Sequence, residues 1–132
     1  MTSKAPIAAL LAGALLAACS EKYAHSELGD DSPEARTVRQ MVADLREAGE
    51  AGLDRLIERD GAGGLTGDQA AALRATLASI VQAERVELKR MDRFGEKVYR
   101  ATLGLHADGS ESELFVLLVA APDGRLRWAG RN

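Results

Sequence analysis

Cysteine and histidine are the residue types in this chain best suited to chemistry, and the sequence contains few of them. Its 132 residues include one cysteine, Cys19, and two histidines, His25 and His106. A nucleophilic site needs a serine or cysteine beside a base, and a metal site needs several His, Cys or carboxylate ligands at fixed spacing. The sequence shows no Ser-His-Asp set, no paired carboxylates and no second ligand at metal spacing from His25. We therefore predict no metal, no cofactor and no catalytic residue, and the sequence favours a protein that is not an enzyme.

Cys19 ends a short apolar segment. One positive residue, Lys4, precedes the apolar stretch from Ala5 to Ala18, which closes on small residues. These are the three parts of an export signal. As a helix the stretch reaches only about 20 Å, whereas the hydrocarbon core of a bilayer is roughly 30 Å thick. The residues Leu16-Ala17-Ala18-Cys19 resemble the lipobox of bacterial lipoproteins, the alternative being an ordinary secretory signal that happens to precede a cysteine.

The resemblance to bacterial lipoproteins implies a location in the cell envelope. It implies removal of residues 1–18 as a signal peptide and attachment of acyl chains, palmitate among them, to Cys19. Several acyl chains anchor a protein stably, so the membrane is the predicted partner. In a bacterium with two membranes, Ser20 resembles the outer-membrane sorting pattern. The domain would then be held at the outer membrane and face the periplasm.

The net charge of the chain limits the kinds of partner it can bind. The chain carries 17 basic and 20 acidic side chains, and loss of residues 1–18, which include one lysine, leaves 16 basic. A net negative domain is a poor match for the phosphate backbone, so we predict no nucleic-acid binding. Arginines outnumber lysines by 13 to 4, which suits ion pairs and contacts to carboxylate or phosphate.

The chain divides into a linking segment and one domain. Residues 19–32 lack apolar periodicity, so we predict a flexible tether in which His25 is a solvated side chain. Ser32 followed by Pro33 predicts the cap and first turn of a helix, and residues 33–132 form a single globular domain.

Helices fill the first half of this domain. An apolar stripe at helical spacing runs through Val38, Met41, Val42, Leu45, Leu53, Leu56 and Ile57. Gly49 and Gly52 interrupt it, which leaves open whether the segment from Ala35 to Ile57 is one helix or two. A further helix is predicted from Thr66 or Gly67 to Ala83.

Strands are predicted for the second half of the domain. The apolar period shifts toward 2, and strands are predicted at about 84–94, 97–106, 113–121 and 125–129, joined by short turns. The third of these is apolar on both faces and is predicted to be central. The fold class is therefore α+β, with two or three N-terminal helices packed on a curved four-stranded antiparallel meander.

This order of elements, with a final Asp-Gly-Arg-Leu-Arg-Trp hairpin, resembles the cystatin-like and NTF2-like α+β superfamily. NTF2-like enzymes use a carboxylate, Tyr or His at the mouth of the cone. The candidate pocket residues that this implies are Tyr99, Trp128, Asp92 and His106. The alternative for Asp92 is an ion pair on the sheet surface with the neighbouring arginines, and for Tyr99 and Trp128 it is a place in the core.

Arginines of the strand half form a candidate basic patch for an acidic partner. Its members are Arg125, Arg127 and Arg100, although arginines paired with nearby carboxylates are the simpler interpretation. We predict an anchored, non-catalytic binding or accessory module for an envelope protein, a peptide or a small ligand. The alternatives are a structural, scaffolding lipoprotein and, with less support, an NTF2-like enzyme with a small pocket. The oligomeric state stays open.

Overall fold

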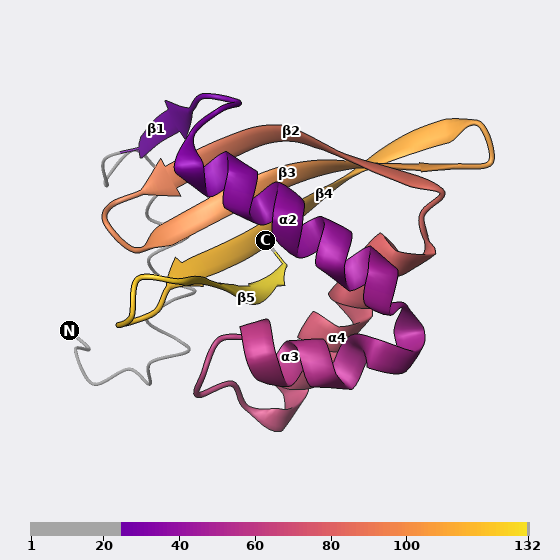
Figure 1. Cartoon of the computed structure of the whole chain (residues 1–132), viewed down its shortest axis with the longest axis horizontal. Coiled ribbons are helices and arrows are strands. Elements are labelled where there is room, and N and C mark those ends of the chain that lie inside the picture. Colours follow the sequence, from indigo (N-terminus) through magenta and orange to yellow (C-terminus); the bar gives the residue numbers. More distant parts are fainter. Residues whose placement is uncertain (1–24, 132) are drawn as a thin grey trace.

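A computed structural model describes residues 25–131, so the predicted signal peptide, Cys19 and Ser20 lie outside the described part (Figure 1). Helices precede most of the sheet. In order, the elements are β1 (His25–Leu28), α2 (Pro33–Ala48), the 3-10 helix η1 (Glu50–Gly52), α3 (Leu53–Asp60), α4 (Gly67–Gln82), β2 (Arg85–Phe94), β3 (Val98–Ala107), β4 (Ser110–Ala120) and β5 (Leu126–Arg131). Among the described helices, none combines the length and the apolar character needed to cross a membrane.

The ends of the helices follow the capping residues in the sequence. The Ser32 hydroxyl accepts a hydrogen bond from the Ala35 backbone N–H at 3.1 Å, and α2 begins with Pro33 as predicted. At α4, Thr66 and Gln69 form a reciprocal capping box. These side-chain hydrogen bonds to backbone N–H groups determine where α2 and α4 start.

The predicted interruption of the first helix is a real break. Gly49 adopts φ 70° and ψ −172°, a conformation almost restricted to glycine. The chain then passes through η1 into α3, so the segment left open in the sequence contains two α-helices. Six of the seven predicted stripe residues are buried, and Ile57 packs against the same core.

The sheet has five antiparallel strands in the order β1-β2-β3-β4-β5, so the prediction of a four-stranded meander is wrong. The four predicted strands correspond to β2 through β5. The additional strand, β1, comes from the segment assigned to the tether and pairs with the end of β2, with Glu27 opposite Asp92. Its sequence, His-Ser-Glu-Leu, has no apolar alternation. It is a strand because the distant β2 edge offers it backbone partners, and a local pattern cannot report that.

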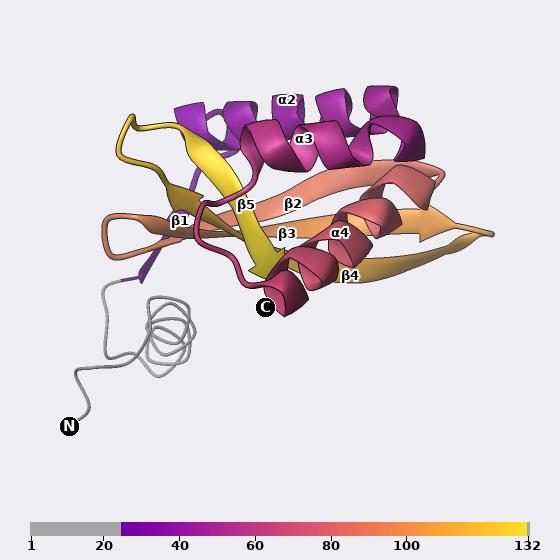
Figure 2. The same cartoon turned by 90° about the horizontal axis from the view of Figure 1, so that it is seen from below.

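The two faces of the sheet have different roles. The inner face packs on all three α-helices through Tyr99, Ala101, Leu103 and Trp128, and Figure 2 shows α2 and α3 on this side. β4 is an interior strand, but β3 lies in the middle of the sheet. On its outer face β4 buries Leu117 and leaves Phe115 37% exposed, so the prediction that both faces are covered holds only in part.

Candidate functional site

A groove opens on the helix side of the molecule, between α2, α3 and the hairpin that joins β4 to β5. It encloses about 380 Å³. Its floor is apolar and its rim is charged. The lining residues are Pro33, Glu34, Thr37, Met41, Asp44, Arg59, Asp60, Tyr99, Ala120, Gly124, Arg125 and Leu126. A mixture of apolar floor and charged rim is typical of binding sites.

Asp60, at the end of α3, is the buried charge of this groove. Only 4% of the Asp60 surface is exposed to solvent. Arg59 donates to both of its carboxylate oxygens, with Nε to Oδ1 at 3.0 Å and Nη2 to Oδ2 at 2.7 Å. Arg125 reaches Oδ1 from the hairpin at 3.4 Å. A buried carboxylate costs free energy unless it is paired, and here two guanidinium groups from two elements pair it.

Arg59 also connects α3 to α2. Its Nη2 lies 3.5 Å from Asp44 Oδ2. The hydrogen bond and charge of Asp60, with a smaller contribution from Asp44, raise the pKa of Arg59 above its ordinary value. The guanidinium is therefore permanently charged and bridges the two helices at the rim.

A second cavity of about 440 Å³ continues the groove along α2 and α3 and shares Asp44 and Arg59 with it. Its further lining residues are Glu47, Ala48, Ala51, Gly52, Arg55 and Leu56. Over both cavities, four carboxylates face three guanidinium groups. The carboxylates are Glu34, Asp44, Glu47 and Asp60, and the guanidinium groups are Arg55, Arg59 and Arg125.

The four candidate pocket residues do not line one cavity. Tyr99 lies at the groove and is 6% exposed, whereas Trp128 is 1% exposed within the core. Asp92 and His106 lie on the outer face of the sheet, because alternate residues of a strand point to opposite faces. The implied mouth of a cone built from all four is therefore not present among the described residues.

On the outer face, Asp92 is completely buried by its partners. Arg90 Nε donates to both oxygens at 3.0 and 2.9 Å, and His25 Nε2 lies 3.0 Å from Oδ1. The ion pair considered for the sequence is thus present. His25 keeps 38% of its side chain accessible to solvent, in line with the prediction, but it also contacts Asp92, which the prediction of a tether did not include. Its imidazole stacks on Phe94 with ring centroids 4.7 Å apart. Neither contact is visible in the sequence, because the partners lie 67 and 69 residues away.

The electrostatics of Asp92 follow from these contacts. Burial works to raise the pKa of its carboxyl group. Hydrogen bonds from Arg90 and His25, together with the charges of Arg90 and Arg100, outweigh burial and lower the pKa below its ordinary value. Asp92 is therefore a structural anion rather than a proton acceptor poised near neutral pH.

Each of the three arginines of the candidate basic patch contacts other groups of the protein. Arg125 contacts Asp60, and Arg127 Nη1 donates to the backbone carbonyl of Arg59 at 2.7 Å. Arg100 lies on the outer face between the rings of Phe94 and Phe115, 5.3 and 5.5 Å from their centroids. Arg100 and Arg127 lie on strands that β4 separates, and Arg125 lies in the hairpin before β5, so the three side chains do not form one patch.

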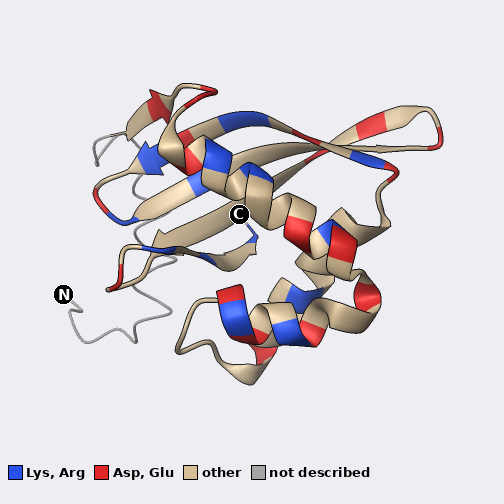
Figure 3. Cartoon of the chain, in the orientation of Figure 1, with Lys and Arg blue, Asp and Glu red and all other residues tan. Residues whose placement is uncertain are grey.

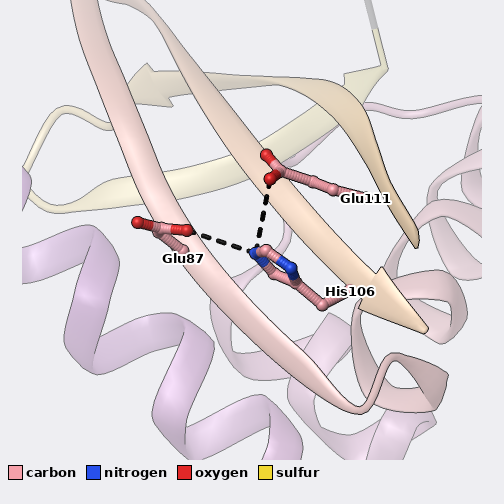
Figure 4. A group of neighbouring side chains, drawn as sticks. All are labelled: Glu87, His106 and Glu111. Carbon is pink, nitrogen blue, oxygen red and sulfur yellow. Dashed lines mark hydrogen bonds and ion pairs between the residues drawn. The ribbon is translucent and has the colours of Figure 1, made fainter. Parts of the chain in front are cut away.

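The described residues contain one group with metal-ligand types, formed by Glu87, His106 and Glu111 at the far end of β2, β3 and β4 (Figure 4). His106 Nε2 lies 3.2 Å from Glu87 Oε1 and 3.7 Å from Glu111 Oε1. Two basic side chains already contact this group. Lys89 Nζ is 2.6 Å from Glu111 Oε2, and Arg85 Nη2 is 3.3 Å from His106 Nδ1.

This arrangement is an ion-pair network rather than a vacant metal centre. An arginine N–H can only donate to Nδ1, so in the neutral imidazole Nε2 carries the proton and points it at the carboxylates. Its lone pair is then not available to a metal. The hydrogen bond and charge of Lys89 lower the pKa of Glu111, although partial burial opposes them. The cluster stabilises the end of a long hairpin.

Comparison with known proteins finds no match: no family model, no curated protein and no solved structure matches the chain. A function for this chain must therefore be inferred from its own residues and their geometry. Sequence reasoning missed Asp60 and the groove around it, because the groove joins α2, α3 and a hairpin more than 60 residues further along the chain. The only local signal was a charged pair, Arg59-Asp60, directly before the glycine-rich turn.

Proposed function

We propose that this chain is a lipid-anchored envelope lipoprotein, acylated at Cys19, whose domain is a non-catalytic binding module. The observation that carries the binding role is the pair of adjoining cavities along α2, with apolar lining at Met41 and Tyr99 and a charged rim. The lipobox-like residues before Cys19 support the anchor.

Binding is favoured over catalysis by the state of the groove carboxylates. Asp60 has both oxygens engaged by arginine donors, so it cannot readily accept a proton from a substrate. Asp44 is paired with Arg59 across the rim. Charged groups that are already paired can exchange partners with an incoming ligand, which is how rim charges contribute specificity.

The shape and charge of the groove indicate the class of ligand. Two adjoining cavities follow α2, which at about 1.5 Å per residue is roughly 24 Å long. An extended peptide segment matches this form better than a compact metabolite. Because carboxylates exceed guanidinium groups, the preferred segment carries apolar side chains and a basic group.

The test is site-specific photo-crosslinking in intact envelopes, with a photoreactive residue at Thr37 in the groove and, as a control, at Ala71 on the exposed side of α4. We expect a defined adduct from position 37 and none from position 71. Equal labelling from both positions, or none from either, would contradict a binding groove and favour a scaffolding lipoprotein.

A charge reversal tests whether the groove rim selects the partner. Glu34→Lys should lower the yield of the position 37 adduct about tenfold, because it makes the rim net positive. Asp68→Lys is the matched control, since Glu34 and Asp68 are both acidic residues in the first turn of a helix and only Glu34 lies in the groove. A loss of the adduct in both variants would point to helix stability instead.

The anchor is tested separately with Cys19→Ser. Metabolic labelling with a clickable fatty acid and membrane fractionation should show label and membrane retention in the wild type and neither in the variant. An unlabelled, soluble wild type would overturn the lipoprotein proposal.

A further inference from the structure

The outer face of the sheet has no helix packed on it within residues 25–131. The core-facing side chains of the three α-helices, such as Leu45, Leu53 and Leu77, all belong to the inner cluster. The outer face instead carries a small apolar cluster of its own around Leu117 and Ala129. Beside it, Phe115 is the large apolar side chain that stands exposed.

Arg100 is held next to Phe115 with hydrogen-bonding capacity to spare. Its guanidinium lies between Phe94 and Phe115, and its Nη2 is 3.6 Å from Asp92 Oδ2, too long for a hydrogen bond. Its Nε is buried and has no hydrogen-bond partner among the described residues, so an external group can reach only the 20% of the side chain that is exposed. Asp92 is occupied by Arg90 and His25, so it leaves the charge of Arg100 only partly compensated.

The described part of the chain begins at this face. Cys19 precedes His25 by six residues, which span at most about 20 Å even when fully extended. His25 begins β1, and its ring stacks on Phe94 on the outer face. Figure 3 shows basic segments of β2 and β3 near β1, which itself carries an acidic segment. A bilayer that holds Cys19 is therefore within reach of the outer face.

We infer that the outer face of the sheet lies against the phospholipid bilayer, with Arg100 donating to a lipid phosphate and Phe115 entering the interfacial region. This inference rests on the proposed acylation of Cys19. Guanidinium groups match phosphate geometry, and apolar rings beside basic groups suit the headgroup layer. The groove lies on the inner side of the sheet, so this orientation turns it away from the membrane and toward a soluble partner.

The test uses the acylated full chain in vesicles of phosphatidylethanolamine and phosphatidylglycerol. A nitroxide is attached to Glu113→Cys, which is exposed on the outer face beside Phe115, or to Thr37→Cys at the groove. Acylated Cys19 does not compete for the label. We expect the nitroxide at 113 to be at least threefold less accessible to an aqueous nickel complex than the one at 37. Equal accessibility would overturn the inference.

Two variants test the named side chains. Phe115→Ser at an exposed position and Arg100→Gln should each restore nickel access at 113 to near the value at 37. Arg74→Gln, an exposed arginine on α4, is the matched control and should change nothing. Because Arg100→Gln alters a buried cluster, an unfolded variant would be disregarded in favour of Phe115→Ser. Protection that survives Phe115→Ser would exclude this face as the contact.

Mass spectrometry of the same sample separates the two proposals. An acylated chain whose position 113 stays in water would refute the docked orientation and leave the anchor intact. A chain that carries no acyl group would refute the anchor, and the inference with it.

Discussion

At the scale of single residues, the most consequential feature is a buried carboxylate on the outer face of the sheet. Asp92 receives hydrogen bonds from Arg90 and His25, and the backbone register places Arg100 opposite it. These contacts tie β1, β2 and β3 together through one anion. The sequence indicated the Arg90 pair, since both residues lie on one face of the same strand, but not His25, whose position depends on tertiary pairing.

We predict that Asp92→Asn lowers the free energy of unfolding by about 2 kcal/mol at neutral pH, because it leaves the guanidinium groups of Arg90 and Arg100 without their anion. Urea unfolding at pH 7 measures this loss. Glu27→Gln is the control, since Glu27 lies 3.8 Å from Arg90 and is exposed. We expect the control to change stability by less than about 0.5 kcal/mol.

The same carboxylate predicts how stability depends on pH. The folded pKa of Asp92 is lower than its ordinary value of about 3.9 in an unfolded chain. Its contribution is therefore fully present above that ordinary value and is lost as the pH falls through the folded pKa. The stability difference between wild type and Asp92→Asn should shrink in acid. A difference that stays constant down to pH 2 would show that the carboxylate charge is not the cause.

At the scale of elements, the groove exists because the first helix breaks. Gly49 redirects the chain, so that α3 turns alongside α2 and places Asp60 opposite the hairpin. The break could be predicted from the two glycines in the apolar stripe. Strands β2 to β5 could also be predicted, because alternation and turn residues are local. β1 could not, since its four residues carry no pattern and its hydrogen-bonding partner lies far along the chain.

We predict that Gly49→Ala destabilises the domain by about 2 kcal/mol, since a side chain is strained at φ 70° and ψ −172°. Gly63→Ala is the matched control, because a Cβ there meets open space and no positive φ is required. Thermal unfolding followed by circular dichroism compares the two variants. If Gly63→Ala were the more damaging substitution, the backbone conformation assigned to Gly49 would be in error.

At the scale of the whole molecule, the face proposed to contact the bilayer and the proposed groove lie on opposite sides of one sheet. β1 begins on the side of the sheet that faces away from α2 and α3 (Figure 2), and the groove is lined by residues of α2, α3 and the hairpin on the inner side. A domain on a short link to the bilayer can then present its groove to a partner without lifting away. Neither side could be derived from the sequence in full, since each surface combines residues from elements that are distant in the chain.

A longer link tests whether contact of the sheet face with lipid, or the short link alone, maintains this orientation. Ten Gly and Ser residues inserted between Glu21 and Lys22 extend the link from six residues to sixteen, which lowers the effective concentration of the face at the bilayer about fourfold. If Arg100 and Phe115 contact lipid, the nitroxide at 113 keeps partial protection from nickel and remains less accessible than the one at 37. If the link alone restrains the domain, protection at 113 falls to the value at 37. Crosslinking from Thr37 should be unaffected by the insertion, because the groove needs no contact with the membrane.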